Sequence, residues 1–188
     1  MKKCFVAFVL LLAVAAGWAQ DRKDIVTIQV QYVDPEGKEQ TGVLECNVAI
    51  EQDLKEIFAE LFRQRYPIEK IRPASEYNFD DERSMTDNNT SCYCYRKVKG
   101  QQNLSKHATG MAIDINPLYN PCLHVRTGMV EPRAGTKYAR NRERWARDRS
   151  LRVRVIDRRD LCYRLFREHG FKWGGDWKSK KDYQHFEK

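Results

Sequence analysis

Two short segments, far apart in the chain, combine residue types that bind divalent metals. The first, Ser-Lys-His-Ala-Thr-Gly-Met-Ala-Ile-Asp at 105–114, supplies His107 and Asp114. The second, Asp-Tyr-Gln-His near the C-terminus, supplies Asp182 and His185. Catalytic zinc sites take three protein ligands and leave one position open for water. His107, Asp114 and His185 meet that count, and Asp182 remains as a candidate general base.

The first segment has local features that suit a pair of metal ligands. Gly110 lets the backbone turn between His107 and Asp114, and Ala112 leaves space near a metal. An aspartate on a strand that looks buried needs a cation or several donors to offset its desolvation. An ordinary hydrogen-bonded histidine and a paired structural acid are the alternatives. Ser105 is expected to orient its neighbours by hydrogen bonding and not to act as a nucleophile.

The second segment must bend if both of its candidate residues are to reach one metal. Asp182 and His185 lie three residues apart, a spacing that points side chains to opposite faces of a straight strand. A solvated acid beside two lysines is the alternative for Asp182. His124 and His169 compete with His185, but each has a sufficient structural role, in a loop and at a helix C-terminus. Few residues follow His185, so this terminal segment is expected to depend on the metal for its order.

The pattern Ser-x-His-x-x-Gly-x-Ala-x-Asp, followed later by Asp-x-x-His, resembles the zinc D-alanyl-D-alanine carboxypeptidase and L-alanyl-D-glutamate endopeptidase family, which includes vancomycin-resistance carboxypeptidases and phage endolysins. The resemblance covers roughly residues 54–186. It implies Zn²⁺ as cofactor, His107, Asp114 and His185 as its ligands, Asp182 as the base, and a hedgehog/DD-peptidase-like fold. Further similar tracts lie at residues 77–85, 89–91, 113–117 and 173–175.

The resemblance implies hydrolysis of a peptidoglycan stem-peptide bond by a metal-activated water. The bond is either a terminal D-alanine linkage or an internal L-alanyl-D-glutamate linkage, and the sequence leaves both open. A zinc-stabilised cell-wall binding module without turnover, as the related hedgehog signalling domain is thought to be, is the alternative from another functional class. The presence of Asp182 favours the enzyme, because a purely structural site needs no extra acid.

A second positive group beside the metal would stabilise the oxyanion that develops during hydrolysis. Arg96 and Arg83 are the candidates, and a surface arginine is the alternative for each. Arg96 is favoured because it lies shortly before His107 on a predicted strand, and the family often places an arginine in this neighbourhood. Trp173 and Trp177 are expected either to line the cleft or to pack in the core.

Length and composition bound the organisation of the chain. With 188 residues, 41% of them hydrophobic and 32% charged, it is long enough for one domain with a real core. Residues 1–19 place Lys2 and Lys3 before an apolar run and small residues, which predicts a cleaved secretory signal. Residues 20–188 are then expected to form one periplasmic or secreted domain, with a hairpin extension at about 20–50 and no membrane span.

Five cysteines follow the predicted signal segment, at positions 46, 92, 94, 122 and 162. Export permits disulfides, so we expect buried thiols or one or two disulfides. Cys92 and Cys94 alternate along a predicted strand and are poorly placed to bond each other. A second metal site built from these two and another thiol is an alternative, although the spacing is unusual for zinc.

Hydrophobic periodicity predicts two helices and several short strands. Strands are expected at 25–33, 41–50, 71–77, 91–98 and 111–115. Helices are expected at 51–65 and from Asp157, as the N-cap, to His169, with Gly170 as the stop. Strands and helices do not alternate as parallel units require, so the predicted class is α+β, with a mainly antiparallel sheet flanked by helices.

Basic residues concentrate at 133–154, which holds nine lysines or arginines and two acids in a chain of net charge +8. Most such runs are simply solvated. Docking of this tract onto anionic envelope polymers is the second interpretation, whereas nucleic acid is not an expected partner of an exported protein.

Overall fold

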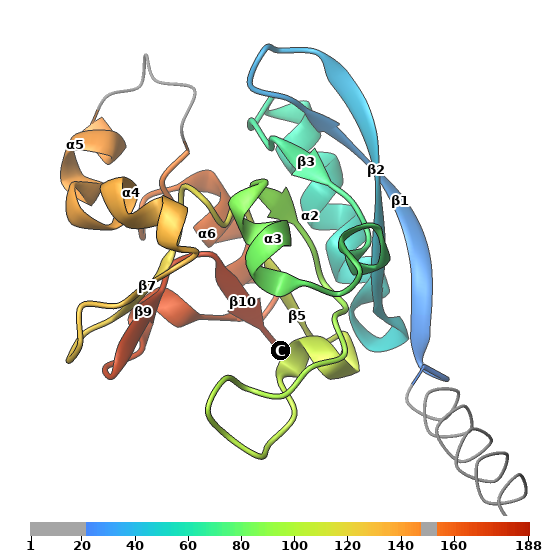
Figure 1. The fold of residues 1–188 in the computed structure, drawn as a ribbon. Helices are drawn as coiled ribbons and strands as arrows, with labels where there is room; N and C mark the ends of the chain where they lie inside the picture. The colour runs from blue at the N-terminus through green and yellow to red at the C-terminus, as the bar shows by residue number, and fades with distance from the viewer. Residues whose placement is uncertain (1–21, 148–153) are drawn as a thin grey trace, which may run out of the picture.

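The computed structural model describes residues 22–147 and 154–188, so the predicted signal segment lies outside it. Within these residues, four small sheets and several short helices surround a hydrophobic core (Figure 1). Three sheets are antiparallel and the fourth is a parallel pair. The predicted α+β class is confirmed, but small separate sheets replace the larger sheet that we expected. No helix among these residues is long and apolar enough to cross a membrane.

The N-terminal hairpin pairs β1 (Ile25–Val33) with β2 (Glu39–Asn47), which confirms the predicted hairpin, but the second strand ends at residue 47 and not at 50. Asp34 closes its turn by accepting hydrogen bonds from the backbone N–H groups of residues 36 and 38. A short turn of 3-10 helix, η1 (Val48–Ile50), leads into α2 (Glu51–Arg63), which confirms the first predicted helix. Alternate side chains of the hairpin and the apolar face of α2 share the core. In Figure 1 the hairpin lies beside α2 as a layer of the molecule.

The chain after α2 is less regular than predicted. Only β3 (Lys70–Ile71) and β4 (Asn89–Thr90) form strands here, paired in parallel. The prediction of a strand over 71–77 was wrong beyond its first residue, because Pro73 starts the 3-10 helix η2 (Ala74–Tyr77). An unpredicted helix, α3 (Asp81–Thr86), follows and is capped by the side chain of the residue before it.

The predicted strand over 91–98 is also absent as a regular element. The N–H of Tyr93 donates to the carbonyl of Glu45, whereas the N–H of Cys94 donates to the carbonyl of His107. Successive residues therefore bind different segments, and this stretch joins the hairpin to the segment that carries the first motif.

A three-stranded antiparallel sheet places β10 (His185–Glu187) between β5 (Ala112–Asp114) and β8 (Lys172–Trp173). Phe186 of β10 is fully buried, and its ring stacks on that of Phe166 with centroids 4.4 Å apart. Sheet pairing and core packing contribute to holding the terminal segment, and its dependence on a metal stays a prediction.

A second three-stranded sheet places β6 (Cys122–His124) between β7 (Val130–Glu131) and β9 (Lys180–Asp182). Because β9 and β10 belong to different sheets, the chain turns at residues 183–184, which is the bend that the spacing required. The segment after β7 holds three short helices: η4 (Arg133–Gly135), α4 (Thr136–Arg140) and α5 (Arg142–Arg147).

The basic tract is not uniformly solvated. Arg142 donates a hydrogen bond of 2.6 Å to the carbonyl of Ile156, and its guanidinium lies 3.5 Å from the ring centroid of Tyr183. Burial lowers the pKa of Arg142 to about 10. This arginine therefore supports the bend between β9 and β10 and is not a free surface charge. Residues 148–153 of the tract lie outside the described part of the chain.

The last helix, α6 (Leu161–Glu168), begins three residues later than predicted. Asp160, and not Asp157, is its N-cap, since the carboxylate of Asp160 accepts from the N–H of Cys162 at 2.9 Å. Gly170 follows the helix with φ of +84°, which confirms the predicted stop. The five cysteines after the predicted signal are all buried free thiols.

The ring of Phe186 stacks on that of Phe166 in α6, so removal of the Phe166 side chain should cause a large loss of stability. Phe166→Ala should lower the free energy of unfolding by about 3–5 kcal/mol, because it leaves a cavity in the core. Val48→Ala is the matched control, since Val48 is 53% exposed and should change stability by no more than about 0.5 kcal/mol. Urea denaturation followed by circular dichroism would measure both, and equal midpoints for the two variants would contradict this account of the core.

Candidate metal centre

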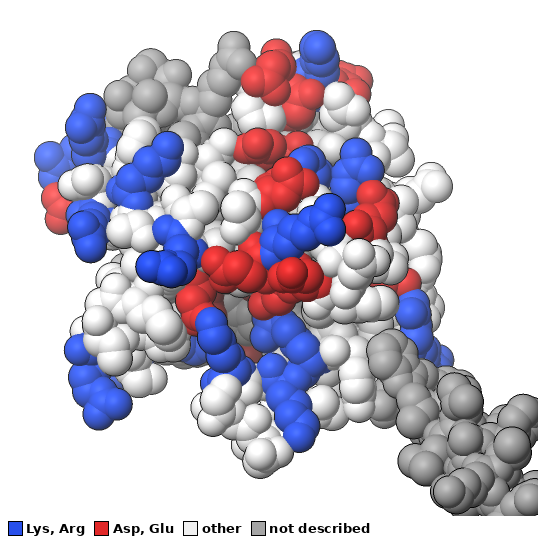
Figure 2. Space-filling view, in the orientation of Figure 1, with Lys and Arg blue, Asp and Glu red and all other residues white. Residues whose placement is uncertain are grey.

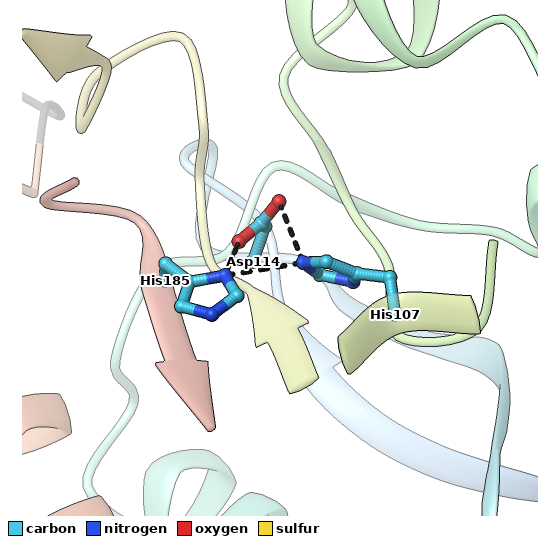
Figure 3. A group of neighbouring side chains, drawn as sticks. All are labelled: His107, Asp114 and His185. Carbon is cyan, nitrogen blue, oxygen red and sulfur yellow. Dashed lines mark hydrogen bonds and ion pairs between the residues drawn. The ribbon is translucent and has the colours of Figure 1, made fainter. Parts of the chain in front are cut away.

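Three side chains from three different elements meet at one point (Figure 3). His107 comes from the 3-10 helix η3 (Lys106–Thr109), and Asp114 and His185 are direct partners on β5 and β10. The Nε2 atom of His107 lies 3.1 Å from Nδ1 of His185 and 3.3 Å from a carboxylate oxygen of Asp114. The other carboxylate oxygen lies 3.1 Å from Nδ1 of His185. All three residues are buried.

The outer nitrogens of both imidazoles have their own acceptors. Nδ1 of His107 lies 2.6 Å from the carbonyl oxygen of Cys92, and Nε2 of His185 lies 3.2 Å from a carboxylate oxygen of Glu187. Because a carbonyl or carboxylate oxygen only accepts, each of these nitrogens carries the hydrogen. The inner nitrogens then turn lone pairs toward each other and toward Asp114. Such an arrangement requires a cation in the middle, and imidazoles held by outer acceptors are typical of metal ligands.

Without a metal, a proton takes the place of that cation. Burial opposes charging of the imidazole, but the hydrogen bonds to Asp114 and Glu187 outweigh burial and raise the pKa of His185 to about 10. Burial likewise opposes ionisation of Asp114, but His107 and His185 hold the pKa of this carboxyl well below its usual range. The metal-free centre is therefore an ion pair between imidazolium and carboxylate.

Backbone features around the first motif fix the position of His107. The hydroxyl of Ser105 accepts from the N–H of His107 at 3.3 Å and caps η3, as expected of a residue that orients its neighbour. Gly110 ends η3 with φ of +67°, and a Cβ there would lie 2.6 Å from the backbone nitrogen of Asn47. The carbonyl of Gly110 accepts a hydrogen bond from the N–H of Asn47, so the motif contacts the hairpin directly.

Asp182 is buried at the end of β9, beside the segment that carries His185. One of its carboxylate oxygens lies 3.3 Å from Nζ of Lys180, and the other is buried with no hydrogen-bond partner among the described residues. Gly174 in η5 (Gly174–Asp176) permits this approach, because a Cβ there would lie 2.7 Å from Cβ of Asp182 and 3.2 Å from Cβ of His185. A buried carboxylate oxygen with nothing to accept from is suited to receive a proton.

The two candidate arginines have different surroundings. Arg83 is exposed on α3, whereas Nη2 of Arg96 lies 3.1 Å from a carboxylate oxygen of Asp81. Burial opposes the shift, but the negative charges of Asp81, Asp114 and Asp182 raise the pKa of Arg96. The charge of Asp114 thus acts on Arg96, and the role of Arg96 beside a metal stays a prediction. In Figure 2 the acidic and basic side chains of this region gather at the middle of the face that carries α3.

Three features of the centre were missed in the sequence. Glu187 lies two residues after His185, so strand alternation could have placed both on one face. Asp81 lies within the tract 77–85 that resembles the family. Its ion pair with Arg96 forms only in the folded chain, so nothing in the sequence indicated its role. The carbonyl of Cys92 has no signal in the sequence, because any residue supplies such an acceptor.

Of the remaining aromatic and histidine candidates, only Trp177 lies beside the centre. Trp173 packs in the core, whereas the ring centroid of Trp177 lies 5.2 Å from that of His185 and borders the centre. Neither competing histidine joins the centre. His124 lies 2.8 Å from a carboxylate oxygen of Glu131, and His169 pairs with an aspartate of α2.

Comparison with known proteins agrees with the motifs. Residues 99–188 match a family model described as D-alanyl-D-alanine carboxypeptidase, a range that contains both motif segments. The resemblance read from the sequence is thereby confirmed over these residues, which are similar to that peptidase family. The rest of the wider resemblance, residues 54–98, lies outside the match. No curated protein and no solved structure matches the chain significantly.

The proton held at the metal-free centre predicts a pH dependence of stability. The pKa of His185 is raised above its unfolded value of about 6.5, so its contribution is complete below about pH 6.5 and is lost as the pH rises through 10. The free energy of unfolding of the metal-free protein should fall over this range by a few kcal/mol relative to His185→Gln, since one pKa unit corresponds to about 1.4 kcal/mol. Denaturation at several pH values in the presence of a chelator would measure the difference.

His169→Gln is the matched control, because His169 lies at the end of α6 and should leave the difference unchanged. A stability profile of His185→Gln that is parallel to that of the wild type would contradict the ion pair.

Proposed function

We propose that this protein is a zinc peptidase that hydrolyses a stem-peptide bond of peptidoglycan. The observation that carries the proposal is the convergence of two imidazole nitrogens and a carboxylate, while the outer nitrogens of both imidazoles have their own acceptors. The match of residues 99–188 to a carboxypeptidase family model supports the reaction class. A hedgehog/DD-peptidase-like fold is part of the same proposal.

His107, Asp114 and His185 would hold the zinc ion. Their facing atoms lie 3.1–3.3 Å apart, and donors bound to one zinc at about 2.0–2.3 Å are separated by roughly 3–4 Å in a tetrahedral arrangement. The residues therefore fit the ion. When bound, zinc lowers the pKa of water to about 7 and polarises the scissile carbonyl.

Asp182 and Arg96 would carry the remaining tasks. Asp182 accepts the proton of the attacking water at its unpartnered oxygen and returns it to the leaving amine. Arg96 supplies positive charge for the oxyanion, and its Nε is buried without a partner among the described residues, so it is available as a donor. Asp81 holds the guanidinium in place through its ion pair.

The substrate bond has two candidates, a terminal D-alanine linkage and an internal L-alanyl-D-glutamate linkage. The description of the matching family favours the carboxypeptidase reaction. A binding module without turnover is the alternative function, and the buried, unpartnered oxygen of Asp182 favours the enzyme. In this proposal the protein acts in the periplasm or outside the cell, and its exposed basic residues between 133 and 147 contact anionic envelope polymers.

The ligand assignment predicts the metal content of variants. His107→Ala and Asp114→Ala should each lose about one equivalent of zinc relative to the wild type, because a catalytic site has only three protein ligands. Elemental analysis of the purified, folded proteins after dialysis would measure this loss. His169→Ala is the control and should keep the wild-type content. Unchanged zinc in either folded test variant would remove that residue from the ligand set.

The assignment of Asp182 as the base predicts a variant that still binds zinc but hydrolyses its substrate slowly. Asp182→Asn keeps the size of the side chain and should retain zinc while hydrolysis slows on the order of 100- to 10,000-fold, the usual contribution of general-base catalysis. Mass spectrometry of purified muropeptides over time would measure the rate and identify the bond. Asp176→Asn is the control, because Asp176 pairs with Arg158 on the surface. Wild-type turnover by Asp182→Asn would exclude Asp182 as the base.

A further inference from the structure

A second group of metal-binding residue types lies on the sheet formed by β7, β6 and β9. It consists of Cys122, His124 and Glu131, each of which offers one ligand atom, and these atoms all lie within 4.8 Å of one another. Nε2 of His124 is 2.8 Å from a carboxylate oxygen of Glu131. The group shares no residue with the centre at His107, Asp114 and His185.

Strand register explains why these side chains meet. Cys122 and His124 are two residues apart on β6, so they point to the same face of the sheet. Glu131 is the direct cross-strand partner of Cys122 on β7, and such partners share a face. The arrangement therefore follows from a regular antiparallel ladder and does not depend on the conformation of a loop.

The burial of the three residues suits an ion that enters from solvent. Cys122 is 4% exposed, whereas the side chains of His124 and Glu131 are 32% and 16% exposed. The thiol is thus the most buried of the three groups, and the imidazole and carboxylate lie between it and solvent. Two ammonium groups lie near these residues. Lys99 pairs with Glu131 but has a side chain that is 75% exposed, and Lys180, the cross-strand partner of His124, pairs with Asp182. An exposed ion pair contributes only about 0–1 kcal/mol, so Lys99 yields easily to a bound metal.

We propose that Cys122, His124 and Glu131 form a second metal site, selective for a borderline transition metal such as Zn²⁺. A thiolate, an imidazole and a carboxylate are all zinc ligands, and the thiolate disfavours Mg²⁺ and Ca²⁺. Uptake of the ion displaces the thiol proton and the ammonium group of Lys99. The site adjoins the proposed base, because Cys122 is also the direct cross-strand partner of Asp182 on β9.

Cobalt provides a probe that distinguishes the two sites. The full protein is freed of metal with a chelator and titrated with Co²⁺ while its absorption spectrum is recorded. A thiolate ligand gives a sulfur-to-cobalt charge-transfer band in the near ultraviolet, which a site of two histidines and one aspartate cannot give. We expect this band in the wild type and in His107→Ala, which removes the other centre. Its loss is expected in Cys122→Ala, and a lower cobalt affinity in Glu131→Gln.

The controls keep each outcome decisive. Cys46→Ala removes a buried thiol on β2 and should leave the band unchanged. Circular dichroism establishes that every variant is folded, and the conservative Glu131→Gln reports on the site independently of Cys122. A wild type without the band, a band that persists in Cys122→Ala, or equal cobalt affinity in Glu131→Gln would each overturn the proposal. These results are independent of hydrolytic activity, so they do not bear on the proposed peptidase.

Discussion

The centre of the structure places two imidazole nitrogens and a carboxylate in one small buried space. This arrangement imposes one electrostatic requirement, which is a cation between them. Cys92 and Glu187 fix the hydrogens of both imidazoles on their outer nitrogens, so nothing within the group can separate the three acceptors. A cation is required, and burial makes its absence costly. A proton satisfies the requirement poorly, because it pairs with only two acceptors at a time, whereas a metal ion contacts all three.

The fold meets this requirement by joining segments that are distant in sequence. The hairpin supports the first motif through the contact between Gly110 and Asn47, and the register of β5 and β10 places Asp114 opposite His185. The bend after β9 leaves Asp182 and His185 both close to Gly174. One sheet thus supplies Asp114 and His185, the sheet that contains β9 supplies Asp182, and η3 supplies His107.

The candidate site was more predictable from the sequence than the fold was. Residue type, spacing and the family resemblance pointed to His107, Asp114 and His185, which the structure brings together, because metal ligation requires particular side chains and leaves few alternatives in a chain with four histidines. The role of Asp182 stays a prediction. The hairpin and α2 were predicted because their apolar positions repeat regularly over many residues. Strands of two or three residues, such as β3 and β8, carry no such periodicity and are defined by their partners.

The same reasoning explains the errors at element boundaries. Asp157 and Asp160 are equally good N-caps by type, and only the hydrogen bond to Cys162 decides between them. The segment 91–98 has the alternating pattern of a strand, but its neighbours are an edge of the hairpin and a 3-10 helix, so no ladder forms. Arg142 lies in a basic tract whose composition predicts solvent exposure. Its burial depends on Tyr183, which packs against it only in the folded chain.

The central position of β10 links the completion of the fold to the creation of the site. β5 and β8 do not pair with each other and are joined only when β10 enters between them, within the part of the chain that the structure describes. The contact between residues 114 and 185 is long-range, and contacts of this kind form late in folding because the intervening chain must first be ordered. A molecule that has folded only as far as β8 holds two of the three inward-facing side chains and leaves Phe166 without its stacking partner. The step that closes the core is thus the step that assembles the centre, so a partly folded chain has no complete centre.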